Sequence, residues 1–264
     1  PVLIGPMKYG LFPGGKKIRS KIIFDVGKIF KVKNKDLLIL AASVEAIHSY
    51  SLIHDDLPCM DDDKLRRGKP STHVKFGEST AILAGNSLLT TAFEILSDKS
   101  FKINAETKSR LINFLSRCSG QTGIAGGQYL DLSYEKKKVS LQKILNMELK
   151  KTGKLFEFCC VAPLIIKKNK KYLNSFSKIG KDIGLLFQIV DDLIDFKGKT
   201  KLAGKKTQKD IKKGKATIIS LLGYKNAVKY AYKLKQNIYS RLKKHNTNAK
   251  DLKETINFIM ERNS

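Results

Sequence analysis

Apolar residues recur at helical spacing along most of the chain, and no strand pattern persists anywhere. One stripe passes through Leu37, Leu40, Val44 and Ile47, and the segment 183–190 is apolar around most of its helical circumference, which is typical of a helix in the middle of a bundle. Further helices are expected approximately at 79–97, 103–119, 140–166, 170–196, 216–223, 225–245 and 248–262. The sequence therefore predicts an all-α fold, a single helical bundle.

The breaks between these helices fall where Gly, Pro and Asn gather, at 13–15, 67–70, 123–127 and 198–214. No repeat with a period of about 20–50 residues occurs, and no linker divides the chain. A chain of 264 residues is long enough to bury roughly 70–75% of the surface that its unfolded form exposes. We therefore expect one domain over residues 1–264.

The chain carries 51 Lys and Arg against 24 Asp and Glu, a formal net charge of +27, and only seven of the cations are arginine. A nucleic-acid or anionic-membrane surface would explain such a balance. Proteins that read nucleic acid use arginine forks and interleaved aromatic residues, and neither accompanies lysine runs such as 136–138 and 167–171. Most of the excess is therefore interpreted as solvent-facing lysine. No nucleic-acid partner is expected, and a polyanion-binding protein is kept only as an alternative.

The sequence does not predict stable insertion in a membrane, since no run of about 18 apolar residues is free of charge and no signal-peptide pattern is found. The four cysteines, Cys59, Cys118, Cys159 and Cys160, lack the spacing of metal ligands. We interpret them as buried thiols in a reducing compartment, so a cytoplasmic protein is expected.

Acid is concentrated in two clusters, at 55–63 and at 191–195. Asp191 and Asp195 are four residues apart, so they lie on one helix face about 6 Å apart along the axis, where like charges repel. A divalent cation offsets that cost, because Mg²⁺ is typically held by one or two carboxylates together with substrate phosphates and water. The alternative for either cluster alone is a helix cap or a solvated acidic turn. Two clusters, one of them inside an apolar helix, favour metal-bridged diphosphate binding.

In the first cluster, Asp55 and Asp61 are six residues apart, which is not the spacing of one helix face. Pro58 is expected to bend the last turn and to return Asp61 to the side of Asp55. Arg66 and Arg67 follow the cluster by one helical turn, where they suit the phosphate that the metal would bind.

A second basic element opens the chain, where Gly14 and Gly15 stand before Lys16 and Arg19. A flexible backbone there can close on an anion that the cations neutralise, although the motif is weak by itself. His48 lies seven residues before the first aspartate cluster, about two turns back on nearly the same side of the helix. Alone, such a histidine is more often a core residue than a ligand.

Together these segments resemble the trans-isoprenyl diphosphate synthases, and within that family the bacterial enzymes that form farnesyl diphosphate. The likeness covers nearly the whole chain. It is most specific at 51–68 and at 187–195, which are similar to the first and second aspartate-rich motifs of the family. The segments 126–132 and 151–153 also stand where the family has them. The resemblance implies a helical bundle around a deep central cavity, in agreement with the periodicity.

The resemblance also implies roles for single residues, with two Mg²⁺ ions on Asp55 and Asp61 and a third on Asp191. The allylic diphosphate is expected to bind these ions together with Arg66, Lys151 and Lys205. The isopentenyl diphosphate is expected to bind Lys16, Arg19, His48 and Arg67. Thr152 and Gln188 are expected to lie beside the allylic cation. The implied reaction is ionisation of dimethylallyl or geranyl diphosphate, attack by the isopentenyl double bond and loss of a proton. Its product would be farnesyl diphosphate, formed by a homodimer.

The chain departs from the family pattern at a few positions, none of them a proposed metal ligand. Ser20 stands where a proline commonly follows the arginine, and Lys150 replaces the usual histidine. A helix that the family usually has before Gly14 is expected to be missing. The segment 197–215, rich in Gly and Lys, is expected either to close over the phosphates as a lid or to be a plain lysine loop.

Two further alternatives come from other classes of protein. A class I terpene cyclase also ionises a diphosphate with an aspartate-rich motif, but it needs no second diphosphate site, so Lys16, Arg19 and His48 argue against it. A non-catalytic subunit of a prenyl synthase could lose one aspartate cluster, whereas both are intact in this chain.

Tyr50 lies five residues before Asp55, where the family places a bulky residue as the floor of the chain-elongation cavity. With the two extra residues between the aspartates, this suggests a C15 product. We therefore expect Tyr50→Ala to release longer prenyl diphosphates, resolved by chain length after incubation with isopentenyl and geranyl diphosphates. An unchanged product length would refute the floor assignment.

Overall fold

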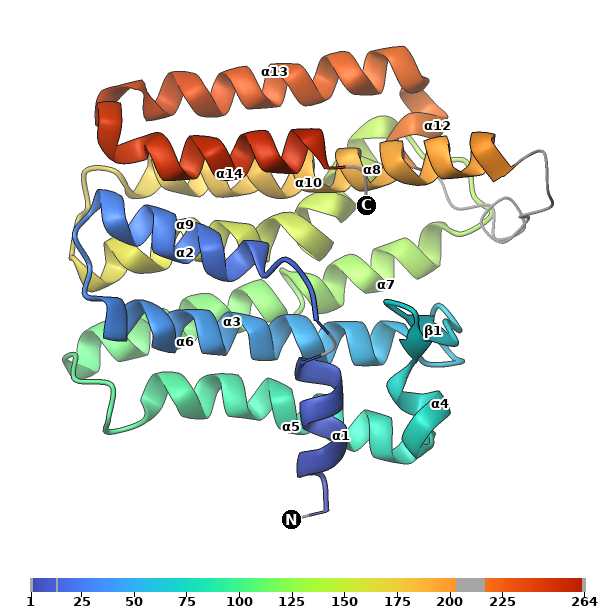
Figure 1. The fold of residues 1–264 in the computed structure, drawn as a ribbon, viewed down its shortest axis with the longest axis horizontal. Coiled ribbons are helices and arrows are strands. Elements are labelled where there is room, and N and C mark those ends of the chain that lie inside the picture. The colour runs from blue at the N-terminus through green and yellow to red at the C-terminus, as the bar shows by residue number, and fades with distance from the viewer. Residues whose placement is uncertain (1, 13, 203–216, 263–264) are drawn as a thin grey trace.

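The computed structural model describes residues 2–12, 14–202 and 217–262, which form a stack of helices (Figure 1). The helices are α1 (Ile4–Leu11), α2 (Ile18–Ile29), α3 (Asn34–Asp55), α4 (Thr72–Phe76), α5 (Glu78–Ser97), α6 (Ala105–Ser119), α7 (Ile124–Tyr134), α8 (Leu141–Glu148), α9 (Lys154–Ile166), α10 (Leu173–Leu202), α12 (Ile218–Leu222), α13 (Tyr224–Leu242) and α14 (Lys250–Glu261). A π-helical turn, η1 (Leu149–Gly153), joins α8 to α9, and a 3₁₀ segment, η2 (Lys243–Ala249), joins α13 to α14. The prediction of an all-α fold is confirmed.

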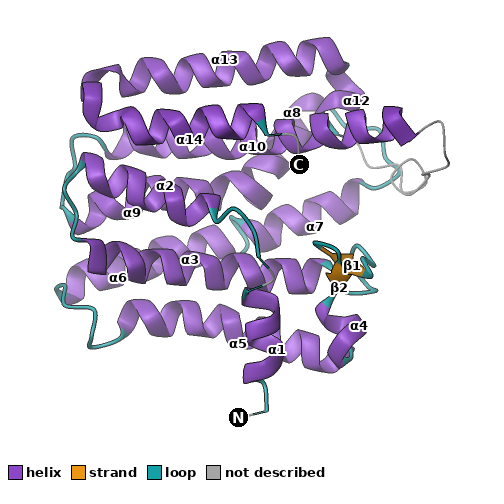
Figure 2. Ribbon diagram, viewed as in Figure 1, coloured by secondary structure: helices purple, strands orange, loops and turns teal. Residues whose placement is uncertain are grey.

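The long helices lie roughly side by side in layers (Figures 1 and 2). α3 packs against α2, α5 and α9, and α10 packs against α9, α13 and α14. α3 and α10 run in the same direction, so their C-terminal ends lie at one end of the bundle (Figure 1). The two aspartate clusters belong to these ends, which brings them to the same end of the molecule.

α3 is the central helix of this arrangement. By length and composition alone it could cross a membrane, but 61% of its most apolar window is buried within the fold. Leu40, Val44 and Ile47 have no exposed surface. The packing of α3 among its neighbours therefore accounts for its apolar composition.

The single helix expected over 140–166 is interrupted by η1. A π turn takes one residue more per turn than an α-helix, and such turns are frequent at functional sites. Here the extra residue falls in the segment that carries Lys151 and Thr152. The apolar periodicity did not reveal it, because both flanking helices keep an apolar face.

The break expected at 123–127 is only partly present, because α7 begins at Ile124 and contains the next two glycines. A Cβ atom added to Gly127 would lie 2.2 Å from the backbone nitrogen of Lys151. Glycine is needed there so that α7 can approach η1, rather than to end a helix. The sequence prediction that Gly marks a loop was wrong at this position.

Two other expectations concern the start of the chain and the cysteines. At the start of the chain, α1 packs on α3 and α5, and the expectation that a helix of the family is missing stays a prediction. Cys118, Cys159 and Cys160 are buried free thiols, as expected. Cys59 is exposed, because it follows Pro58 in the loop that leaves the bundle, so its predicted burial was wrong.

Two strands, β1 (Leu65–Arg66) and β2 (Lys69–Pro70), form the one antiparallel ladder in the part of the chain that the structure describes. Arg67 and Gly68 form the turn between them, with φ of +54° and +75°, as in a type I′ hairpin. Arg66 and Arg67 therefore lie on a hairpin, and their expected helical spacing from the aspartates was wrong.

Candidate active site

A cavity of about 550 Å³ lies at the end of the bundle where α3 ends. Its lining comes from the start of α2, from α3, the hairpin, η1 and α10. The cavity brings together the predicted site residues Lys16, Arg19, His48, Asp55, Arg66, Arg67, Lys151, Thr152, Gln188 and Asp191. Asp61 lies next to it rather than in its lining, and Lys205 is outside the described residues, as is most of the predicted lid.

The chain folds back after α3, as the position of Pro58 predicted. The backbone N–H of Asp61 donates to the carbonyl oxygen of Asp55 at 2.9 Å, which returns Asp61 to the end of the helix. Burial raises the pKa of the Asp55 carboxyl to about 7, against the effect of the Lys151 ammonium and with the support of the charge of Asp61. The charged form of the Asp55 carboxyl is therefore poorly stabilised by the protein alone, and a bound cation would stabilise it.

Asp56, unlike Asp55, does not line the cavity. Its side chain is almost fully buried and is directed to the hairpin. Arg66 Nε donates to its two carboxylate oxygens at 3.0 and 3.2 Å, and Arg66 Nη2 makes a further hydrogen bond to Oδ1. The Arg66 guanidinium also lies 3.6 Å from the carboxylate of Asp63. Arg66, predicted as a phosphate ligand, is thus bound to carboxylates while still lining the cavity.

The lining of the cavity also has a basic group, and we call Lys16, Arg19, His48 and Arg67 the basic wall. Gly15 has φ of +128°, and a Cβ atom there would lie 2.3 Å from Nη1 of Arg67. The absence of a side chain at Gly15 therefore lets the Arg67 guanidinium pack on the turn that carries Lys16. The ammonium of Lys16 lies 5.3 Å from the ring centre of Phe258 on α14.

Arg19 is the innermost cation of the basic wall. Its guanidinium lies 4.8 Å from the ring centre of Phe156 and 5.7 Å from that of Phe187, and its Nη1 lies 3.2 Å from Nε2 of His48. A guanidinium only donates, so His48 accepts through Nε2. Burial, and then the charge of Arg19, lower the pKa of His48, so His48 is neutral.

Arg19 also keeps a buried donor, since its Nε has no hydrogen-bond partner within the described residues. An unmet donor on a buried cation is costly unless an anion completes it. Burial lowers the pKa of Arg19, which is a further sign of an uncompensated positive charge. The basic wall therefore fits an anionic ligand that accepts several hydrogen bonds.

The lining of the cavity also includes a group of polar side chains, Lys151, Thr152 and Gln188. Lys151 Nζ donates to Asp131 Oδ2 at 2.6 Å, and Thr152 Oγ1 donates to Gln188 Oε1 at 3.3 Å. Gln188 Nε2 in turn donates to Asp192 Oδ1 at 3.1 Å. Lys151, Thr152 and Gln188 are thus oriented by contacts that include Asp131 and Asp192, to which the sequence analysis gave no role.

Arg262, after the end of α14, is a site residue that sequence reasoning missed. Its Nη2 lies 2.7 Å from Asp191 Oδ1 and donates to the carbonyl oxygen of Phe187 at 2.6 Å, with the guanidinium 3.7 Å from the Phe187 ring centre. α14 is held on α2 by Thr255 Oγ1, which donates to the buried Asp25 Oδ2 at 2.5 Å. No motif pointed to Arg262, because its partner is 71 residues away in sequence and only tertiary packing joins them.

No group of three His, Cys, Asp or Glu side chains in the described ranges could hold a metal ion by itself. Asp55 with Asp61, and Asp191 with Asp195 near it, instead offer two separate carboxylate sites. Mg²⁺ is commonly held in this way, by one or two carboxylates with water and ligand phosphates as the other ligands. The residues fit Mg²⁺ that is shared with a phosphorylated ligand.

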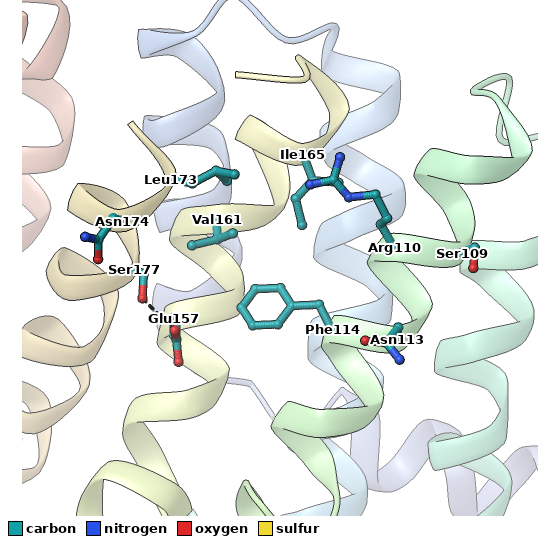
Figure 3. A pocket seen from close by; sticks show the side chains of 10 residues that line it. All are labelled: Ser109, Arg110, Asn113, Phe114, Glu157, Val161, Ile165, Leu173, Asn174 and Ser177. Atoms are coloured by element: carbon teal, nitrogen blue, oxygen red, sulfur yellow. Dashed lines mark hydrogen bonds between the residues drawn. The ribbon is translucent and has the colours of Figure 1, made fainter. Parts of the chain in front are cut away.

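A second cavity, of about 560 Å³, lies between α6, α9 and α10 (Figure 3). Phe114, Val161 and Ile165 form its apolar side, and Glu157 receives a hydrogen bond from Ser177 on another side (Figure 3). None of the predicted site residues lines it. The first cavity is therefore the candidate active site.

Comparison with known proteins agrees with this assignment. A family model described as polyprenyl synthetase matches residues 1–259. The chain belongs to the polyprenyl synthetase family. It is 40% identical over 267 residues to a farnesyl diphosphate synthase of Escherichia coli, a match that covers 99% of this chain and 89% of that protein.

Solved structures of polyprenyl synthetases have the same fold. An FPP/GFPP synthase from Zymomonas mobilis is 37% identical, with a TM-score of 0.88, over 98% of this chain and 88% of that one. A geranyltransferase from Helicobacter pylori, complexed with magnesium and isoprenyl diphosphate, is 30% identical, with a TM-score of 0.83, over 98% of this chain and 87% of that one. The resemblance inferred from the aspartate clusters is therefore confirmed at the level of the family.

The raised pKa of Asp55 predicts how stability depends on pH in the presence of EDTA. A folded-state pKa of about 7, above the ordinary value near 4, means that the contribution of Asp55 to stability is full at low pH and is lost as pH rises through 7. Relative to Asp55→Asn, we expect the wild-type free energy of unfolding to fall by on the order of 2 kcal/mol between about pH 5 and pH 8, measured by urea denaturation.

Asp62→Asn is the matched control, because Asp62 is exposed in the same loop. It should leave the shape of the pH dependence unchanged. Parallel pH curves for the wild type and Asp55→Asn would contradict the prediction.

Proposed function

We propose that this chain is a Mg²⁺-dependent farnesyl diphosphate synthase, which condenses isopentenyl diphosphate with dimethylallyl or geranyl diphosphate. The observation that carries the proposal is one cavity whose lining includes both the carboxylates Asp55 and Asp191 and the cations of the basic wall. A prenyltransferase needs two diphosphate sites of different kinds, one through metal and one through cations. The name of the Escherichia coli relative supports this activity.

The basic wall would bind the diphosphate of isopentenyl diphosphate. The unmet Nε of Arg19, the neutral His48 and the exposed Lys16 offer donors to its oxygens. This side lacks an unpaired carboxylate among its described residues, since Glu45 receives hydrogen bonds from Lys17 and Ser20. The second diphosphate can therefore bind there without a metal ion.

The allylic diphosphate would bind on the carboxylate side, with Asp55, Asp61 and Asp191 as the ligands of three Mg²⁺ ions. When bound, the metal supplies positive charge to the departing diphosphate. Lys151 adds a cation that Asp131 holds in place at 2.6 Å. Arg66 would act beside it from its fixed position on Asp56, and Lys205, outside the described residues, is proposed as a further ligand.

Thr152 and Gln188 lie between the two diphosphate sites. Thr152 is buried, and its hydroxyl donates to the Gln188 carbonyl oxygen, so its lone pairs are available to a developing positive charge on the allyl group. The apolar helices around them exclude water, which would otherwise trap the carbocation. The proton lost at the end of the reaction would pass to the released diphosphate.

A class I terpene cyclase is the nearest rival. It ionises one diphosphate and has no use for a second anion site. The buried unmet donor of Arg19, whose guanidinium contacts the neutral His48, favours the two-substrate enzyme.

An assay of product formation tests the proposal directly. With Mg²⁺, isopentenyl diphosphate and either allylic diphosphate we expect farnesyl diphosphate, and no product with EDTA or with one substrate alone. Product from farnesyl diphosphate alone would identify a cyclase instead. No product from a folded sample in any combination would refute the proposal.

In the same assay, Lys151→Met should lower kcat by between about tenfold and hundredfold, the cost of a charge-assisted contact in the transition state. Lys150→Met is the matched control, because the neighbouring lysine does not line the cavity. If kcat fell equally in the two variants, the role assigned to Lys151 would be refuted.

We further propose that the enzyme is a cytoplasmic homodimer. On α5, Ile82 and Leu83 are 41% and 52% exposed, and Val74 on the adjoining α4 is 49% exposed. Such an apolar group on a surface rich in lysine is typical of a protein contact. We expect sedimentation to give about twice the chain mass of 29.6 kDa, and Ile82→Glu to shift it toward one chain. A monomeric wild type would contradict this.

A further inference from the structure

Ser20 departs from the family pattern, in which proline commonly follows the arginine, and its side chain makes a specific contact. Ser20 Oγ donates to Glu45 Oε1 at 2.7 Å. Ser20 belongs to the first turn of α2, and Glu45 is buried on α3. The hydrogen bond therefore joins two helices, and a proline could not make it.

Lys17 occupies the other oxygen of the same carboxylate. Its ammonium lies 3.1 Å from Glu45 Oε2 and 3.2 Å from the carbonyl oxygen of Leu11 at the end of α1. Lys17 therefore fastens the end of α1 and the start of α2 to α3, and its own backbone takes a left-handed conformation with φ of +46°. Of the two adjacent lysines, Lys17 thus contacts α1 and α3, and Lys16 is exposed in the lining of the cavity.

Glu45 is an acid in an unexpected place. It lines the same cavity as Lys16, Arg19 and His48, where a free carboxylate would repel a diphosphate and compete with it for Arg19. Its oxygens accept hydrogen bonds from Ser20 and Lys17, so the carboxylate is turned toward the start of α2. This arrangement leaves the Nε donor of Arg19 unpaired for a ligand.

We propose that Ser20, together with Lys17, positions the Glu45 carboxylate so that Arg19 stays available to the diphosphate of isopentenyl diphosphate. Ser20 is thus a positioning residue of the basic wall and makes no contact with the substrate. The inference rests on the proposed function, because it assigns the basic wall to that substrate. Loss of the Ser20 hydroxyl frees one oxygen of Glu45, which then pairs with Arg19 and weakens diphosphate binding.

The test is the affinity for inorganic diphosphate in EDTA, measured by calorimetry on the full chain. Without metal ions the aspartates repel diphosphate, so binding depends on the cations of the cavity, the basic wall among them. We expect Ser20→Ala to bind about five- to tenfold more weakly than the wild type, as for the loss of one hydrogen bond to a charged group. Ser20→Thr keeps the hydroxyl and should bind within about twofold of the wild type.

Ser177→Ala is a matched control from another part of the molecule. Ser177 Oγ donates to Glu157 Oε1 at 2.6 Å (Figure 3). Lys154 lies 2.9 Å from the other oxygen, so a serine and a lysine again share one glutamate, with Lys181 as a further ammonium 3.2 Å from Oε1. Its removal should cost similar stability in urea denaturation and leave diphosphate affinity unchanged.

Steady-state kinetics supply the second measurement. Ser20→Ala should raise KM for isopentenyl diphosphate by a similar factor, with kcat and KM for geranyl diphosphate near wild type. The positioning role would be overturned if Ser20→Ala bound diphosphate as tightly as the wild type, or if the wild type did not bind it. It would also be overturned if Ser20→Thr or Ser177→Ala lost as much diphosphate affinity as Ser20→Ala.

The proposed function and the positioning role of Ser20 can be refuted independently of each other. A wild type that binds diphosphate but forms no prenyl product refutes the proposed function, whereas the ranking of the Ser20 variants in calorimetry still decides the positioning role.

Discussion

Paired charge governs this active site: four carboxylates in and around it are already bound to a cation of the protein. Asp56 holds Arg66, Asp131 holds Lys151, Glu45 holds Lys17 and Asp191 holds Arg262. A buried charge without a partner is expensive, so these pairs make a strongly polar cavity compatible with a stable bundle. Among the groups left incompletely satisfied are Asp55, with its raised pKa, Oδ2 of Asp192, and the Nε atoms of Arg19 and Arg262. The carboxylates suit a cation and the guanidinium groups suit an anion.

The fold takes these groups from different helices. Asp55 ends α3, Arg19 lies in the first turn of α2, and His48, two turns before Asp55 on α3, contacts Arg19. α10 brings Gln188 and Asp191 to the same end because it runs in the same direction as α3 (Figure 1). A diphosphate bound to metal and one bound by cations can therefore lie in one cavity without sharing ligands.

The helices and most of the site residues could be predicted from the sequence, because apolar periodicity and the aspartate clusters are local patterns. The return of Asp61 to Asp55 was predicted from Pro58 alone. What could not be predicted depends on tertiary contact. From the sequence Gly127 resembles a helix breaker, and only the structure shows that it allows the close approach of Lys151. Arg262 belongs to no sequence motif, and it reaches Asp191 only because α14 packs on α2. Arg66 and Arg67 were expected at helical spacing because a two-residue ladder is too short to have a pattern.

The π turn η1 has a consequence for the phase of the helices around it. One added residue turns everything after it by about 100° relative to a continuous helix. α8 buries only Ile144, Met147 and Glu148, while α9 buries nearly its whole circumference from Leu155 to Ile165. A deletion of one residue within 149–153 would rotate one of these helices against its neighbours. The length of this segment is thus as strongly constrained as its composition.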